Sequence, residues 1–272
     1  MKTEYRRHRM RVALVIVLAM IAAVATWWAL SKSGSQRGRP HVILITVESV
    51  RTDHMASFGG ERITCPNLDA LAREGVAYDD AHTVTSWTLP AHASLFTGLY
   101  PAVHQTTGPE SRLHDSYTTL AEILSEDGYQ CAGIVSGPYL QKQHNLHQGF
   151  EYYDESPSEV DQERAHGDIT NPEMAAALDD LVKNKRDSDR PLFLFAYFWD
   201  PHYDYIPPAP YNAMFITPTC ESIDVTGYEA SRTVHPDISE GQLEYVISQY
   251  DGELRCTDHY LGKFFALLKE KN

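Results

Sequence analysis

Three polar residues in two stretches of this 272-residue sequence have types and placements that could do chemistry. Glu48 follows an apolar run, and a carboxylate there is suited to hold a hard or borderline divalent cation. Thr88 stands before a Leu-Pro step at the expected start of a helix, where free N–H groups and the helix dipole favour an anion. His92, one helical turn on, would face the same side and could bind an oxyanion. The pattern fits a metal-bound hydroxyl that is deprotonated and attacks phosphorus or sulfur.

A third stretch, "WDPHYDYIPP", places Asp200 and His202 on a loop after a buried strand, where polar residues often serve function. Its Trp, Tyr and Pro residues could wall a pocket. Each candidate has a structural alternative. Glu48 could be a surface acid at a strand end, Thr88 could simply cap its helix, and the Asp200–His202 pair could be a turn.

Alternating strands and helices are predicted around these residues. Three runs are apolar and strand-like, "HVILITVES" from His41 to Ser49, a run ending near Ser136, and "PLFLFAYFW". Helices are expected from Pro66 to Gly75, before Gly128, over "NPEMAAALDDLVKN", and over a long apolar-periodic segment that opens with Ser239 and Gln242 as a capping box.

This alternation predicts an α/β fold with a doubly wound, mostly parallel sheet. In such sheets the functional residues lie in loops beyond the carboxyl ends of the strands. The rule selects Glu48–Asp53, Ser136–Leu140 and Trp199–Tyr205 as the loops that should surround a site.

The N-terminus is predicted to be a membrane anchor. Residues 12–30 are 19 uncharged residues, close to the roughly 20 that a spanning helix needs. The basic residues before them favour a cytoplasmic tail at residues 1–11, a single-pass helix, a linker at 31–40 and an extracytoplasmic body at 41–272. A cleaved signal peptide is the alternative, because Ala23-Val24-Ala25 resembles a cleavage site.

The charge of the chain bears on its partners, and the cysteine spacing bears on the kind of site it could hold. The net charge is −14, although the first 40 residues hold eight Lys or Arg and one acid, so the body is strongly acidic. An acidic body argues against nucleic acid as a partner, since phosphate binding needs a basic face. The four cysteines show no zinc-ligand spacing, and the sequence leaves open whether they form disulfides or buried thiols.

The chain resembles the sulfatase family, within the alkaline-phosphatase-like superfamily, from about Pro40 to Leu268. The resemblance is carried by six blocks in the family's order: "HVILITVESVRTDHMASFGG", "CPNLDALAREGVAYDDAHT", "SWTLPAHASLFTGLYPAVH", "GYQCAGIVSGPYLQKQHNLHQGFEYY", "PLFLFAYFWDPH" and "YDGELRCTDHYLGKFF". It implies an alkaline-phosphatase-like fold and a divalent metal ion (Ca, Mg, Mn or Zn). The substrate would be a sulfate or phosphate ester, for which a lipid and a glycan are the candidates.

The resemblance also assigns roles. It implies Thr88, His92 and His202 as catalytic residues, with Glu48 and Thr88 as metal ligands. Several positions depart from the family's sulfatases. Thr88 stands where they carry the Cys or Ser that becomes formylglycine, and Gly137-Pro138-Tyr139 replaces a Lys-x-His.

The departures leave three functions open. The first is a membrane-anchored hydrolase of sulfuric or phosphoric esters. The second is a phosphoethanolamine- or phosphoglycerol-type transferase, since enzymes of that type use a threonine nucleophile and a single glutamate, like Glu48-Ser49 here. The third is a non-catalytic binding protein.

The family's later Asp-His or Asp-Asn block does not occur in this sequence, and Asp258-His259 falls inside the long helix. Residues 41–272 are therefore expected to be the N-terminal part of a catalytic domain.

Overall fold

The computed structural model describes residues 18–22, 26, 38–158, 170–202, 204–225, 235 and 237–270. The predicted cytoplasmic tail lies outside the described residues, as do most of the predicted membrane segment and linker. Within those ranges, no helix is both long and apolar enough to cross a membrane. The membrane anchor therefore stays a prediction.

The centre of the molecule is a sheet of four parallel strands, as the alternating pattern predicted. The strands are β1 (Val42–Val47), β2 (Gln130–Val135), β3 (Tyr152–Asp154) and β4 (Leu192–Phe198). Their order in space is β1-β4-β2-β3, so the last strand in sequence pairs with the first. Strand β3, only three residues long, is the one strand of this sheet that the sequence analysis did not predict.

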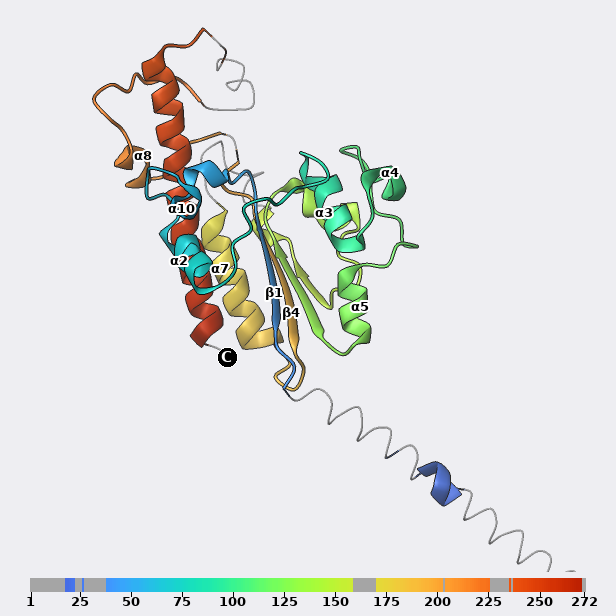
Figure 1. The fold of residues 1–272 in the computed structure, drawn as a ribbon. Coiled ribbons are helices and arrows are strands. Elements are labelled where there is room, and N and C mark those ends of the chain that lie inside the picture. Colours follow the sequence, from blue (N-terminus) through green and yellow to red (C-terminus); the bar gives the residue numbers. More distant parts are fainter. Residues whose placement is uncertain are drawn as a thin grey trace, which may run out of the picture.

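Helices and short turns connect the strands. They are η1 (Thr52–His54), η2 (Ala56–Phe58), α2 (Pro66–Glu74), α3 (Thr88–Thr97), α4 (Pro101–His104), α5 (Leu120–Glu126), η3 (Pro138–Leu140), η4 (Lys142–His144), α7 (Asn171–Asp180) with a π turn, η5 (Leu181–Lys185), α8 (Tyr211–Met214) and α10 (Glu240–Glu270). Figure 1 shows α3, α4 and α5 on one side of the sheet and α2, α7 and α10 on the other. This is the doubly wound arrangement.

Successive side chains of β4 point to opposite faces of the sheet and therefore into two separate hydrophobic layers. Phe193, Phe195 and Tyr197 face the layer that contains α3 and α5. Leu192, Leu194, Ala196 and Phe198 face α7 and α10. Every residue of β4 is buried, as expected for a strand covered on both faces. Tyr197 is the one side chain of this strand with a polar group.

Local sequence signals set the ends of several helices. Pro66 is the first residue of α2 and Gly75 follows its last turn. Ser239 and Gln242 exchange side-chain to backbone hydrogen bonds at the start of α10, which confirms the predicted capping box. Asp258 lies inside α10, and its carboxylate accepts hydrogen bonds from the first N–H groups of α2. It therefore caps a neighbouring helix.

The four cysteines are all free thiols. Burial raises the pKa of Cys65 and of Cys256 to about 12, and that of Cys131 to about 11. These three thiols stay protonated at physiological pH and behave as small apolar side chains.

The carboxyl ends of β1, β2 and β4 meet at one edge of the sheet. The Glu48 N–H donates to Phe198 O, and the Ser136 N–H donates to Tyr197 O. The Ser136 hydroxyl in turn accepts the N–H of Trp199 at 2.8 Å. The three loops that the sequence selected are thus joined at their first residues.

Candidate active site

Thr88 and Glu48 are in direct contact at this edge. The Thr88 hydroxyl donates to Glu48 Oε2 at 2.9 Å, and Thr88 is 7% exposed. Thr88 is the first residue of α3, while Trp87 occupies the cap position without a side-chain cap bond. The alternative that Thr88 only caps its helix is therefore wrong, because its hydroxyl points to the carboxylate.

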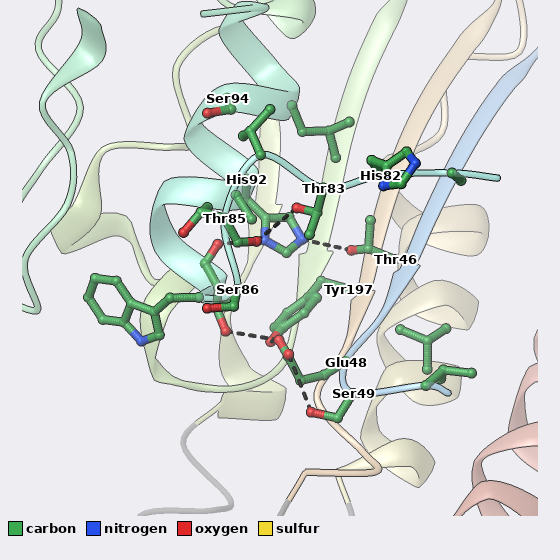
Figure 2. Close-up of a pocket in the computed structure, with 18 residues that line it drawn as sticks. Thr46, Glu48, Ser49, His82, Thr83, Thr85, Ser86, His92, Ser94 and Tyr197 are labelled. Carbon is green, nitrogen blue, oxygen red and sulfur yellow. Dashed lines mark hydrogen bonds between the residues drawn. The ribbon is translucent and has the colours of Figure 1, made fainter. Parts of the chain in front are cut away.

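Tyr197 is a third member of this contact, and sequence reasoning missed it. Its hydroxyl donates to the same Glu48 Oε2 at 2.6 Å (Figure 2). Burial, followed by the charge of Glu48, raises the pKa of Tyr197 well above its usual value, so the phenol stays protonated. A signal was available: a tyrosine in a strand of Phe, Leu and Ala needs a partner for its hydroxyl.

The backbone after Glu48 is held in an unusual conformation. Ser49 has φ 52°, in the left-handed region that residues other than glycine seldom adopt. The Tyr250 hydroxyl of α10 donates to Ser49 O at 2.8 Å and accepts the Arg51 N–H at 2.9 Å. This bridge fixes the turn that directs the Glu48 side chain.

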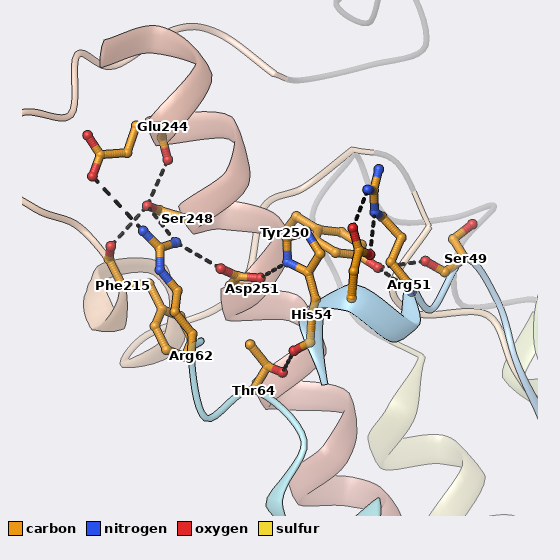
Figure 3. Close-up of polar contacts among 11 residues, drawn as sticks. Ser49, Arg51, His54, Arg62, Thr64, Phe215, Glu244, Ser248, Tyr250 and Asp251 are labelled. Atoms are coloured by element: carbon orange, nitrogen blue, oxygen red, sulfur yellow. Dashed lines mark hydrogen bonds and ion pairs between the residues drawn. The ribbon is translucent and has the colours of Figure 1, made fainter. Parts of the chain in front are cut away.

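A buried carboxylate ties the next part of the same segment to α10 (Figure 3). Asp251 accepts His54 Nδ1–H at 2.6 Å through one oxygen and Arg62 at 2.8 Å through the other. The Asp251 side chain is 1% exposed, whereas those of His54 and Arg62 are 20% and 30% exposed. Segment 49–62 is thus attached to α10 at both ends.

His92 lies behind Thr88 with both ring nitrogens engaged. Its Nδ1–H donates to Thr88 O at 2.9 Å, so Nε2 accepts the Thr46 hydroxyl at 3.0 Å. Burial lowers the pKa of His92, which favours this neutral ring. The residue links α3 to β1, and its predicted contact with an ester oxygen stays a prediction.

His202 and Asp200 follow β4 at the same edge of the sheet. The His202 ring stacks on Trp199 with centroids 3.8 Å apart. Asp200 is buried and accepts both the N–H and the hydroxyl of Thr170, the residue before α7. Asp200 therefore anchors the start of a helix, and no described contact brings His202 to Thr88 or Glu48.

Gly137 supports the Trp199 side of the site. It has φ +84°, and an added Cβ would lie 2.3 Å from Trp199 Cε3. We expect Gly137→Ala to destabilise the fold by about 1–3 kcal/mol and to shift the tryptophan fluorescence, because the ring must move. Gly59→Ala is the matched control, since Gly59 has φ +94° and no neighbour within 4 Å. Equal urea midpoints for the two variants would show that the contact with Trp199 contributes nothing.

Glu253 of α10 supports the loop that carries His202. Its Oε1 accepts the Ile206 N–H at 2.7 Å, and its buried Oε2 has no hydrogen-bond partner among the described residues. Burial, reinforced by Asp200 and Asp204, raises the pKa of Glu253 well above the ordinary 4.5. The folded protein therefore keeps this proton at pH values where the unfolded chain has lost it.

Glu253 should make the stability of the folded protein depend on pH. Stability should fall as pH rises above about 4.5 and towards the raised pKa, because the unfolded chain releases the proton first. We expect Glu253→Gln to raise the urea midpoint at pH 8, with the gain shrinking towards pH 5. Glu126→Gln, on the exposed surface of α5, is the control. A gain for Glu253→Gln that is the same at both pH values would contradict a buried titrating carboxyl.

The pocket beside Glu48 and Thr88 has a volume of about 650 Å³. Its walls are the end of β1, segment 81–87 and the first turns of α3. The labelled side chains in Figure 2 are mostly hydroxyls, among them Ser49, Thr83 and Thr85. Glu48 is the one carboxylate among the lining residues. Thr88 and Glu48 are both among the residues that line this pocket.

The family model described as Sulfatase matches residues 40–272. An N-acetylglucosamine-6-O-sulfatase of Bacteroides thetaiotaomicron is 23% identical over 70% of this chain and 36% of its own length. An arylsulfatase of Clostridium perfringens is 26% identical over 85% of this chain and 60% of its own. The chain thus spans less than two thirds of these relatives.

A solved structure has the same fold. The phosphonate monoester hydrolase of Agrobacterium radiobacter superposes with a TM-score of 0.62 at 21% identity. The match covers 85% of this chain and 60% of that one. This similarity shows that the parallel sheet and its helices are arranged as in that hydrolase.

Proposed function

Because this chain belongs to the sulfatase family, we propose that it carries the nucleophile side of a metal-dependent hydrolase of sulfuric or phosphoric esters. The observation that carries the proposal is the 2.9 Å hydrogen bond from Thr88 to Glu48 Oε2, at the carboxyl edge of a parallel sheet and at the wall of a pocket. Ligands bind at this edge in open α/β folds. A nucleophile and a carboxylate in hydrogen-bond contact form the start of a catalytic group.

The donor chemistry at this point fits a divalent cation. A carboxylate and a hydroxyl supply the oxygen atoms that hard cations prefer. Within the described ranges, no cluster of three or more His, Cys, Asp or Glu side chains could hold a metal ion. Glu48 and Thr88 would therefore supply some of the oxygen ligands of such an ion. Such an ion would polarise the ester and lower the pKa of the Thr88 hydroxyl.

The residues of this chain would then act in two displacements. Thr88 Oγ1 attacks sulfur or phosphorus, its proton passes to Glu48 Oε2, and the bond to the leaving alcohol breaks as that oxygen takes a proton from solvent. A water molecule next attacks the threonine ester at sulfur or phosphorus and gives up a proton to solvent. The bond to Thr88 Oγ1 then breaks, Oγ1 takes its proton back from Glu48 Oε2, and sulfate or phosphate leaves. Trp87 lines the pocket together with Thr88, and its ring meets the Tyr139 ring edge to face at 5.0 Å. The two rings would help to keep the site closed to bulk water.

A transferase is the second candidate, favoured by the threonine at position 88. A formylglycine hydrate can expel sulfate by collapsing to an aldehyde, whereas a threonine ester needs a second attack at sulfur or phosphorus. An alcohol in place of water would complete a phospho-group transfer. The N-terminal segment at 12–30 supports a lipid substrate in this case, since it would hold the body beside a membrane. We propose an extracytoplasmic location for that body on the same basis.

The test is a comparison of substrates on the full-length protein. Aryl sulfate, aryl phosphate, aryl phosphonate monoester and a phosphodiester are assayed side by side, with and without Ca²⁺, Mg²⁺, Mn²⁺ or Zn²⁺ after chelation. Turnover that depends on one cation supports the hydrolase. Transfer to an added alcohol at the expense of hydrolysis supports the transferase. Full activity after exhaustive chelation would remove the metal from the proposal.

A further inference from the structure

Tyr197 occupies a fixed position in the centre of the sheet. Its Cα lies opposite Thr46 in β1 and opposite Val135 in β2, and its side chain is 0% exposed. The ring meets the His92 ring edge to face at 5.0 Å and the Trp199 ring at 6.4 Å. The phenol oxygen is therefore placed by packing on two sides, independently of the carboxylate that it contacts.

The two oxygens of Glu48 have different surroundings. Oε2 accepts hydrogen bonds from Tyr197 at 2.6 Å and from Thr88 at 2.9 Å. These two donors fill the acceptor capacity of that atom. Oε1 has a long contact, 3.5 Å, with the Ser49 hydroxyl. The hydrogen bonds thus orient the carboxylate with Oε2 towards Thr88 and leave Oε1 as its more available ligand atom.

The geometry points to Tyr197 as a positioning residue that holds Glu48 ready to bind the cation, an inference that rests on the proposed function. The Thr88 hydrogen bond to Oε2 disappears once Thr88 has lost its proton or become an ester. The Tyr197 hydrogen bond takes no part in that change. Tyr197 therefore keeps the carboxylate in place through both displacements, and it does so without touching the substrate.

Tyr197→Phe tests this role because it removes only the phenol oxygen and keeps the ring that packs on His92 and Trp199. The full-length protein and its variants are titrated by calorimetry with Ca²⁺, Mg²⁺, Mn²⁺ and Zn²⁺ alone. We expect Tyr197→Phe to weaken binding of the preferred cation by about 10–100-fold. Turnover lost in this variant should recover as that cation is raised to saturation.

Tyr153→Phe is the matched control. The Tyr153 hydroxyl is also buried and donates to Leu140 O, but it lies on β3. Its removal should leave the cation affinity unchanged. Glu48→Gln should abolish binding and so report on the proposed function itself.

Several results would overturn the inference. If Glu48→Gln loses the cation and Tyr197→Phe binds within about two-fold of the unmodified protein, Tyr197 has no positioning role and the metal site stands. If Tyr153→Phe weakens binding as much as Tyr197→Phe, the effect is general loss of packing. If Glu48→Gln binds as well as the unmodified protein, the metal site fails and the role of Tyr197 fails with it.

Discussion

Thr88→Val should lower kcat/KM of the full-length protein by about 10³-fold or more, since removing a covalent nucleophile leaves only binding and electrostatic effects. Valine has nearly the shape of threonine, so the first turn of α3 should be retained. Glu48 keeps its hydrogen bond from Tyr197 in this variant. The loss should be the same for aryl sulfate and aryl phosphate if one hydroxyl attacks both.

Two further variants serve as comparisons for Thr88→Val. Thr97→Val removes a hydroxyl from the same helix, where it donates to Ala93 O, and should leave turnover unchanged. Thr88→Ser restores a hydroxyl and should recover part of the rate. Mass spectrometry of the quenched protein should find a sulfo or phosphoryl group on Thr88. Turnover that survives Thr88→Val would exclude Thr88 as the nucleophile.

Asp251→Ala should destabilise the protein by about 3 kcal/mol, the lower end of the range for breaking a buried ion pair. The variant leaves Arg62 without its closest acceptor, the carboxylate that lies at 2.8 Å. The loss of stability is expected at the lower end of that range because the Arg62 side chain is 30% exposed and water can solvate it in part. The urea midpoint measures the effect.

Asp53→Asn is the matched control for Asp251. The pair between Arg51 and Asp53 lies in the same segment, but both side chains are more than 60% exposed. Exposed pairs contribute little, so this midpoint should not move. Activity should also fall in Asp251→Ala, because segment 49–62 begins one residue after Glu48. An Asp251→Ala protein as stable as the control would mean that α10 does not hold this segment.

The sequence predicted the edge of the sheet where the site lies, but not the atoms that meet there. Strand-end positions, Glu48 among them, followed from apolar runs and from the rule for parallel sheets. The pairing of Glu48 with Thr88 was implied by the family resemblance. His92 was a candidate because it lies one helical turn after Thr88, and Asp200 because it lies on a loop after a buried strand. In the structure Asp200 accepts a hydrogen bond from Thr170, and His92 is hydrogen-bonded to Thr46. These partners depend on how α7 and β1 are arranged in space.

The contact between Tyr197 and Glu48 could not be predicted from the sequence. Periodicity assigns it to a buried strand, yet its role depends on β4 lying next to β1. That neighbour relation is a property of strand order, which a single sequence does not encode in any local pattern. The three-residue strand β3 is too short to give a pattern at all.

The pairing of β1 with β4 also has a consequence during synthesis. Glu48 and Tyr197 are 149 residues apart in the chain. At a synthesis rate of about 5–20 residues per second, β1 leaves the ribosome roughly 7–30 s before its partner strand. During that interval an uncharged apolar strand, VILITV, has no neighbour to pair with. A holding chaperone that recognises extended apolar segments should therefore associate with nascent chains once β1 has emerged and leave once β4 emerges.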